Sequence, residues 1–519
     1  MSEQNKTENE MTENENPQVK HTEENAVHLW ADEQALKKSQ KKIKKLKTTL
    51  VIVIVAAVLL GWVGGSLLPI SFLDSFRSRL NAIKTISSSD KISEVLKIME
   101  NDWYFGSTID NLDDRLVDQA LTGITSNDED THTEYMSADE MASFTQSINR
   151  NYVGIGVSYV QNGSTNMVEE VFKDSPAEKA GVQAGDIIHA VDGTVIDGMS
   201  SADIKAMIQG DEGTTVSITF IRDGQYLNLE LTRAAVSATA FGKKLSDGTI
   251  YLRLSQFGDG TPSEVKGYLS DLAVDESDKL ILDLRNDGGG YLNSAEAIAS
   301  LFLPANKIVL TEQYATGPDE VVKTSGGELT NIHNIVILVN ENTASAAEVL
   351  TLALKQQRDD VTIVGTTTYG KGTVQVTRTF TDGSALKYTT AKWISADGTW
   401  VNGTGITPDV EVRLHDVMYN TFAGMKDDEK YQYDSVSDAV KDMQLCLDYL
   451  GYAPGRTDGY FSNETTEALK KFQSEHSMEA TGILDKTAYE ALEGAVAFDW
   501  STTTTHDVQL QKAQVLLNG

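Results

Sequence analysis

Two residues of this 519-residue chain, Ser345 and Lys371, lie in sequence contexts that suit chemistry. Ser345 follows an apolar run that begins at Ile335 and precedes a run of strong helix formers, so we expect it at a strand-to-helix corner. The first N–H groups of a helix have no partner within the helix and can hold a developing oxyanion. The pattern therefore favours a serine nucleophile, with the N–H of Ala346 as one oxyanion donor.

Lys371 lies between Gly370 and Gly372, and neither neighbour has a side chain that would prevent close approach to another backbone. No histidine lies near either candidate, and lysine is a known substitute for histidine as the base of a serine nucleophile. Such a lysine must be neutral, so burial must lower its pKa far below about 10.4. Gln375 lies four residues further on, and residues at that spacing on a strand share a face, so its amide could orient the lysine.

A nucleotide-binding loop or a penicillin-binding site fits the sequence less well. Residues 365–372 are one residue short of a phosphate-binding P-loop, which needs Ser or Thr where Gly372 stands and a helix where residues 373–380 alternate like a strand. Ser263 and Lys266 have the spacing of penicillin-binding enzymes, but the other motifs of those enzymes do not follow. A helix cap at Ser345 and a simple turn at Lys371 remain the structural alternatives for each residue alone.

Residues 342–348 and 370–375 together resemble the carboxyl-terminal processing proteases, the S41 tail-specific peptidases. Residues 283–290 resemble the family's glycine loop, residues 403–409 its closing segment, and residues 130–136 the stretch before its PDZ domain. The resemblance implies an α/β crotonase-like protease core over residues 234–415. It also implies Gln375 as third member of the catalytic site and Gly289 as a second oxyanion donor. One departure is Asp287-Gly288, which stands where the family usually has Asn-Pro or a similar pair.

Residues 151–233 resemble a PDZ domain, a β-sandwich or barrel-like fold. Gly154, Ile155 and Gly156 resemble its carboxylate-binding loop, because two glycines leave the backbone N–H groups free to bind a chain terminus. A bare Gly-Ile-Gly is an ordinary turn, but here a groove helix is expected at residues 201–209 and a hairpin at residues 214–233. We expect this domain to bind protein substrates with free, apolar C-termini.

The amino end predicts membrane topology. Residues 1–47 form a polar tail that ends in seven lysines, and residues 48–69 include 21 residues without a charge, enough to span a bilayer. The lysines predict a cytoplasmic tail, a single transmembrane helix and an extracytoplasmic remainder. A cleaved signal peptide is the alternative, but the apolar run is too long for one. Residues 70–150 are expected to form a stalk and a small helical cap, which offers a homodimer contact.

The carboxyl end carries another module. Residues 434–495 resemble the three-helix peptidoglycan-binding domain of wall hydrolases, and Asp485 would cap its last helix. The alternative is a small helical bundle without a ligand, because a fold does not determine a function. Residues 496–519 are expected to be a C-terminal tail, Ser/Thr-rich from Trp500 onward, without a role that the sequence indicates.

The composition argues against several kinds of partner, covalent cross-link and ligand. The formal net charge of −32 argues against a nucleic-acid partner. The single Cys446 excludes an internal disulfide, and the eight histidines have no metal-ligand spacing, so neither a metal nor a cofactor is expected.

The sequence therefore predicts a multidomain, membrane-anchored serine endopeptidase at a Gram-positive-type cell surface. It would recognise substrate C-termini through the PDZ domain and bind peptidoglycan. The alternative is a non-catalytic scaffold that holds secreted tails and wall polymer. Retention of Ser345, Lys371 and Gln375 together argues against that alternative, since a scaffold does not need them.

Overall fold

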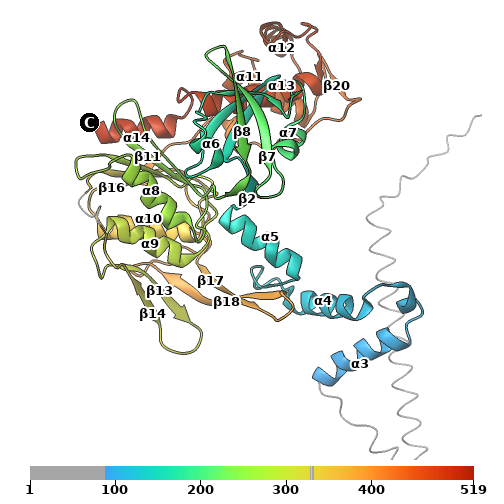
Figure 1. Ribbon diagram of the computed structural model, residues 1–519, viewed down its shortest axis with the longest axis vertical. Coiled ribbons are helices and arrows are strands. Elements are labelled where there is room, and N and C mark those ends of the chain that lie inside the picture. The colour runs from blue at the N-terminus through green and yellow to red at the C-terminus, as the bar shows by residue number, and fades with distance from the viewer. Residues whose placement is uncertain (1–87, 328, 330–331, 519) are drawn as a thin grey trace, which may run out of the picture. The chain divides into compact units, whose positions relative to one another are not determined.

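The computed structural model describes residues 88–327, 329 and 332–518, which fall into two compact units (Figure 1). The first unit ends at Asp113, and its described part holds helix α3 (Ser88–Asn101) and the 3-10 helix η1 (Gly106–Thr108). The second unit begins at Asp114, within the first turn of helix α4 (Leu112–Thr125), and holds the elements that follow α4. Helices α3 and α4 lie in the segment for which a helical cap was predicted.

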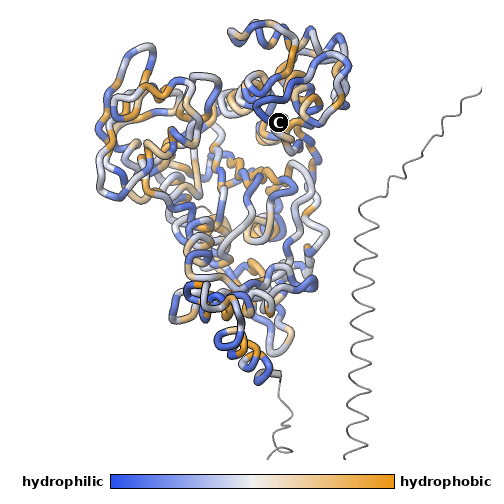
Figure 2. The backbone as a smooth tube through the Cα atoms, turned by 90° about the vertical axis from the view of Figure 1, so that its right-hand side faces the viewer, coloured by the Kyte–Doolittle hydropathy of each residue, from blue (hydrophilic) through white to orange (hydrophobic). Residues whose placement is uncertain are grey.

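None of the helices in the described segments is long and apolar enough to cross a membrane. Hydrophobic and hydrophilic residues are interspersed along the coloured part of the backbone (Figure 2). The predicted transmembrane helix at residues 48–69 and the predicted cytoplasmic tail at residues 1–47 lie outside the described residues.

The segment predicted as a PDZ domain forms a sheet in the order β3-β4-β5-β7-β8, with β6 paired to β5. Along β7 the buried and less buried positions alternate, so every second residue points into a core that includes Val216, Ile218 and Phe220. Its strands and helices are β3 (Val157–Asn162), β4 (Thr165–Val171), β5 (Ile187–Val191), β6 (Thr194–Val195), β7 (Thr215–Arg222), β8 (Gln225–Thr232), α6 (Pro176–Lys179) and α7 (Ser201–Ile208). A separate pair, β2 (Tyr152–Gly154) and β9 (Ala234–Val236), is antiparallel.

The segment predicted as the protease core is built on a six-stranded sheet in the order β10-β11-β12-β15-β16-β19. The pair β10–β11 is antiparallel, and the other pairs are parallel. The strands are β10 (Ala240–Lys244), β11 (Ile250–Leu254), β12 (Leu280–Asp283), β15 (Ile335–Val339), β16 (Val361–Gly365) and β19 (Val410–Glu411). Parallel strands of this kind are buried on both faces, which explains the continuous apolar runs in the sequence.

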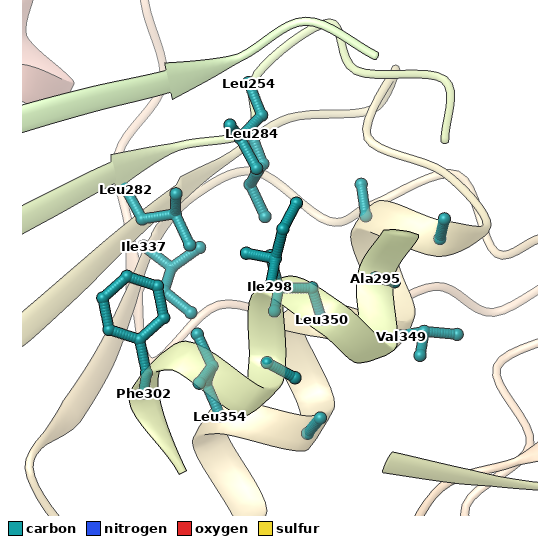
Figure 3. Close-up of a cluster of buried hydrophobic side chains, with 14 of the residues drawn as sticks. Leu254, Leu282, Leu284, Ala295, Ile298, Phe302, Ile337, Val349, Leu350 and Leu354 are labelled. Atoms are coloured by element: carbon teal, nitrogen blue, oxygen red, sulfur yellow. The ribbon is translucent and has the colours of Figure 1, made fainter. Parts of the chain in front are cut away.

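Helices α8 (Thr261–Asp271), α9 (Leu292–Phe302) and α10 (Ala346–Gln357) contribute to the main core cluster of this sheet. Figure 3 shows side chains of α9 and α10 that point toward side chains of the strands. The labelled residues of this cluster are Leu254, Leu282, Leu284, Ala295, Ile298, Phe302, Ile337, Val349, Leu350 and Leu354. The α/β architecture predicted for this region is therefore confirmed.

A second sheet carries the lysine segment. Its order is β1-β18-β13-β14, and β17 pairs with β18. The strands are β1 (Glu134–Met136), β13 (Ile308–Tyr314), β14 (Glu320–Lys323), β17 (Thr373–Thr379) and β18 (Ala385–Ile394). Helix α5 (Ala138–Asn149) follows β1 and begins at a capping box formed by Ser137 and Glu140.

The carboxyl module forms the three predicted helices α11 (Asp438–Tyr449), α12 (Asn463–Glu475) and α13 (Lys486–Thr502), with a short pair β20 (Lys430–Tyr431) and β21 (Leu484–Asp485). As predicted, Asp485 caps α13, because its Oδ1 accepts the N–H of Ala488 at 3.0 Å. The remaining described residues include a further helix, α14 (Val508–Asn518), in the segment for which the sequence indicated no role.

Candidate active site

Ser345 lies at the corner between β15 and α10, as the helix N-cap. Its backbone has φ 55° and ψ −118°, a combination that a residue with a Cβ adopts only when its surroundings enforce it, at a cost of about 1–3 kcal/mol. Two hydrogen bonds hold the preceding turn: Thr343 Oγ1 donates to Leu284 O at 2.8 Å, and Ala344 N donates to Asp287 O at 2.9 Å. The half-buried serine is therefore fixed at a strained corner.

Lys371 lies in the loop between β16 and β17, and both flanking glycines are required by close packing. A Cβ at Gly370 (φ 84°) would lie 2.6 Å from Gly405 N, and a Cβ at Gly372 would lie 2.7 Å from the Cβ of Asn402. The two glycines thus allow the lysine loop to pack closely against the segment around residues 401–405, as their spacing predicted. The carbonyl of Lys371 also accepts a hydrogen bond from Trp393 Nε1 at 2.8 Å.

Ser345, Lys371 and Gln375 line the same cavity, whose volume is about 390 Å³. Gly288 and Gly290 of the glycine loop line it as well. Its apolar wall includes Phe144, Ile148, Tyr291, Leu292, Val374 and Val376. The cavity is therefore bordered by the three predicted catalytic residues and by apolar residues that could hold a peptide.

The electrostatic surroundings favour a neutral lysine. Burial, and after it the positive charge of Lys387, lower the pKa of Lys371 below its ordinary value, while Asp130 and Glu134 oppose the shift. The direction is the one that a general base requires.

Charged residues on helices normally face solvent, but Glu348 of α10 does not. It is completely buried, and its carboxylate accepts four hydrogen bonds. Oε2 accepts the N–H groups of Ser345 at 2.9 Å and Lys371 at 2.8 Å, and Oε1 accepts from Thr368 Oγ1 at 2.5 Å and Gly370 N at 2.8 Å. Glu348 therefore joins the serine corner to the lysine loop. Its place three residues after the serine, the position of a capping-box Glu, was the available sequence signal.

Strand alternation predicted that Gln375 and Lys371 share one face of a strand, but Lys371 lies outside the strand. Strand β17 begins at Thr373, after the lysine, and its pairing register shifts between Val374 and Gln375. The amide Nε2 of Gln375 donates to Thr373 Oγ1 at 2.9 Å and to Thr389 Oγ1 at 3.2 Å. The orienting role of Gln375 toward the lysine stays a prediction.

The stretch before α5 also lies close to the lysine. Thr389 Oγ1 donates to Asp130 Oδ1 at 3.2 Å, so Asp130 and Gln375 are linked through one threonine hydroxyl. Burial, and after it the charge of Lys371, lower the pKa of His132. The sequence had marked residues 130–136 only as a family motif, because nothing local predicts that they reach the lysine.

The glycine loop packs directly on the serine corner. A Cβ at Gly289 (φ 94°) would lie 2.7 Å from Ala344 O and 2.9 Å from Ala346 N. However, Gly289 N donates to Asp287 Oδ1 at 2.8 Å, so this N–H is occupied in the observed conformation. Ala346, the other predicted oxyanion donor, is the first residue of α10 and is buried.

Asp287 itself is a buried acid. Its Oδ2 has no hydrogen-bond partner among the described residues, and burial raises the pKa of the carboxyl group well above its ordinary value against the opposing effects of Gly289 N–H and Arg150. A protonated Asp would carry one O–H donor and an acceptor oxygen, whereas Asn carries two N–H donors and an acceptor oxygen.

The predicted carboxylate-binding loop borders a second cavity of about 350 Å³ between β3 and α7. Gly154, Ile155 and Gly156 all line it. Gly156 has φ 84°, and a Cβ there would lie 2.2 Å from the Cβ of Ser175, so only glycine fits. The predicted loop residues therefore border a cavity, and their binding of a chain terminus stays a prediction. Across residues 88–327, 329 and 332–518 no group of three or more His, Cys, Asp or Glu residues could hold a metal ion.

Three family models match the chain: peptidase family S41 at residues 248–412, a PDZ domain at residues 167–222, and a peptidoglycan-binding domain at residues 436–492. The chain is 33% identical over 403 residues to a protein of Staphylococcus haemolyticus named "Probable CtpA-like serine protease", an alignment that covers 77% of this chain and 79% of the relative. It is 30% identical over 447 residues to the carboxy-terminal processing protease CtpA of Bacillus subtilis, with 86% and 92% covered. The solved photosystem II D1 C-terminal processing protease shares 25% identity, with 61% of this chain and 88% of that chain covered and a TM-score of 0.35.

Proposed function

Because this chain belongs to the carboxy-terminal processing proteases of peptidase family S41, we propose that Ser345 is its nucleophile and Lys371 its general base. The observation that carries the proposal is the cavity that both residues line, with their backbones joined through Glu348. The lowered pKa of Lys371 supports the role of a base that is neutral before reaction.

In this mechanism the Oγ of Ser345 attacks the scissile carbonyl carbon, and its proton moves to Nζ of Lys371. The carbonyl oxygen becomes an oxyanion, which the N–H of Ala346 and the glycine loop would stabilise. Collapse of the tetrahedral intermediate breaks the C–N bond, and the lysine returns the proton to the leaving amine. A water molecule then hydrolyses the acyl-enzyme, with Lys371 again as base. Gln375 would orient the lysine.

The cavity at Gly154, Ile155 and Gly156 would bind the free C-terminal carboxylate of an unstructured protein substrate with an apolar end. The carboxyl module would hold the enzyme at peptidoglycan, as the family-model match supports. The apolar run at residues 48–69 and the lysines before it support a single membrane anchor with the catalytic domains outside the cytoplasm.

The central test compares Ser345→Ala and Lys371→Ala with the unchanged enzyme on an unstructured protein that has an apolar C-terminus. Each variant should lose at least about a thousandfold in kcat while keeping its circular dichroism spectrum, because the two groups act as one unit. Gln375→Ala should lose less, since an orienting group makes no bond. Substantial activity in a folded Ser345→Ala or Lys371→Ala variant would contradict the assignment.

A separate experiment tests the proposed membrane orientation. Protease added to intact cells stripped of their wall should degrade the PDZ and protease domains and leave an epitope at the amino end. Loss of that epitope under the same conditions would show that the orientation is wrong.

A further inference from the structure

Helix α14 covers the second face of the protease sheet. Its residues Leu510, Ala513 and Leu517 are buried and repeat at helical spacing, so they form one apolar face. They pack against residues of four strands of the six-stranded sheet, namely Tyr251, Ile281, Val336, Leu338 and Val364. Neighbouring residues of these strands point to the opposite face, where α9 and α10 cover them. The sheet therefore obtains its second apolar layer from the end of the chain, after the carboxyl module.

A buried ionic network joins the start of α14 to the same sheet. The two carboxylate oxygens of Asp507 accept from Nη1 and Nη2 of Arg285 at 2.8 Å and 2.9 Å. The other side of the guanidinium donates to Asp283, at 2.9 Å from Nε to Oδ1 and 2.6 Å from Nη2 to Oδ2. Gln509 Oε1 accepts from Nη1 at 3.1 Å. Arg285 and Asp507 are both buried, with side-chain exposures of 8% and 9%.

Asp507 also begins the helix, because its Oδ1 accepts the N–H of Leu510 at 2.9 Å. The carboxylate of Asp507 thus determines both where α14 begins and where the guanidinium of Arg285 lies. A bidentate pair of this kind constrains direction as well as distance.

Arg285 immediately precedes the glycine loop of the active site. Asn286, with φ 60°, Asp287 and the three glycines follow it without a helix or strand between. Gly288 and Gly290 line the cavity of Ser345, and Gly289 packs against the serine corner. A shift of the guanidinium would therefore be passed to the backbone of the loop that lines the cavity of Ser345.

We propose that α14 is a part of the catalytic core and that Asp507 is a positioning residue, which holds the glycine loop in register with Ser345 through Arg285. The carboxyl module is then inserted between β19 and the last helix of the core. This inference rests on the proposed function, because the effect of Asp507 is expressed through the proposed catalytic serine. Asp507 touches no reacting atom.

The test is Asp507→Asn in the full chain, with kcat and KM measured separately on the unstructured substrate. Asn can still cap a helix but lacks the negative charge and the second acceptor oxygen. We expect kcat to fall by about tenfold to a hundredfold, since small misplacements of catalytic groups cost that much, and KM to change by less than about twofold. The matched control is Asp485→Asn, which alters the N-cap of α13 in the carboxyl module and should leave kcat within about twofold of the original.

Folding is checked by circular dichroism and thermal melting of each variant. If Asp507→Asn is unfolded at the assay temperature, Asp507→Glu decides the question, because it keeps the charge but displaces it by one methylene. A folded Asp507→Glu enzyme with reduced kcat and unchanged KM supports the proposal. A folded Asp507→Asn or Asp507→Glu enzyme with the original kcat overturns it. Failure of the proposed function would be separate, because then Ser345→Ala would cleave substrate as well as the unchanged enzyme.

Discussion

Ser345 and Lys371 donate their backbone N–H groups to the same carboxylate oxygen, Oε2 of Glu348. The proposed nucleophile, at the start of a helix, and the proposed base, on a loop 26 positions later in the sequence, therefore bond the same buried oxygen atom through their backbones. Since Glu348 itself belongs to the first turn of α10, the lysine loop is fixed relative to the helix that carries the serine. The relative placement of the two groups thus depends on Glu348.

Glu348→Gln should lower kcat by about tenfold to a hundredfold with little change in KM. Gln has one acceptor oxygen in place of two, so its amide NH₂ must face N–H donors, and hydrogen bonds to charged groups contribute about 1.5–3 kcal/mol each. Steady-state kinetics on the unstructured substrate measure the effect. Glu341→Gln is the control, because Glu341 is an exposed residue of the same turn and bonds only Thr366 among the contacts seen in the described chain. Equal kcat values for the two variants would contradict the role of Glu348.

Asp287→Asn should keep activity and change the pH dependence of stability. Because the folded state raises the pKa of Asp287, the folded protein binds more protons than the unfolded one above the ordinary value of 3.8. The contribution of Asp287 to the free energy of unfolding is therefore fully present below pH 3.8. It is lost as the pH rises toward the raised pKa, by at most about 1.4 kcal/mol per pH unit. Asn cannot ionise, so this loss should disappear in the variant.

The measurement is the thermal midpoint of the protease-core transition between about pH 4 and about pH 8. The thermal midpoint of Asp287→Asn should rise relative to that of the unchanged protein as pH rises. The control is Asp382→Asn, at a turn where the carboxyl pKa is lowered, and its midpoint should show no such relative rise. A constant difference between Asp287→Asn and the unchanged protein across this range would show that Asp287 does not titrate as argued.

The sequence predicted the parts of the site that depend on local pattern. A strand, a turn and a helix around Ser345 follow from apolar runs and helix formers, and two glycines around Lys371 indicated close backbone contact. Glu348 was missed because a lone Glu in a helix is normally solvated, whereas every residue from Ala346 to Leu354 is buried here. Helix α14 was missed because its partners on the sheet are far away in sequence, as Asp507 and Arg285, 222 positions apart, illustrate.

Lys387→Met should shift the pH–rate profile to higher pH. The positive charge of Lys387 contributes to the lowered pKa of Lys371, so its removal raises that pKa. The base works only when neutral, and kcat/KM rises as pH passes its pKa, so the rising limb of the profile should move toward alkaline pH. Lys323→Met, at an exposed position of the same sheet, is the control and should leave the limb in place. An unmoved limb in Lys387→Met would exclude Lys371 as the group that titrates.

The final prediction connects the PDZ cavity with cleavage. Backbone N–H groups at Gly154, Ile155 and Gly156 are proposed to bind the terminal carboxylate of the substrate, and an amide cap removes its charge. A charge-assisted hydrogen bond contributes about 1.5–3 kcal/mol, so amidation should weaken capture by about tenfold to a hundredfold. The effect should be largest at low substrate concentration, since binding rather than bond cleavage is altered.

One peptide with a free and with an amidated C-terminus is compared on the full enzyme and on Gly156→Ala. Alanine at this position would force its Cβ against the Cβ of Ser175, 2.2 Å away, and should therefore distort the loop. The variant should cleave the free peptide as slowly as the unchanged enzyme cleaves the amidated one, and Gly163→Ala, at a hairpin turn with open space around it, should still prefer the free terminus. Equal rates for both peptides on the unchanged enzyme would remove C-terminal recognition and leave a Ser-Lys endopeptidase whose PDZ cavity serves another ligand.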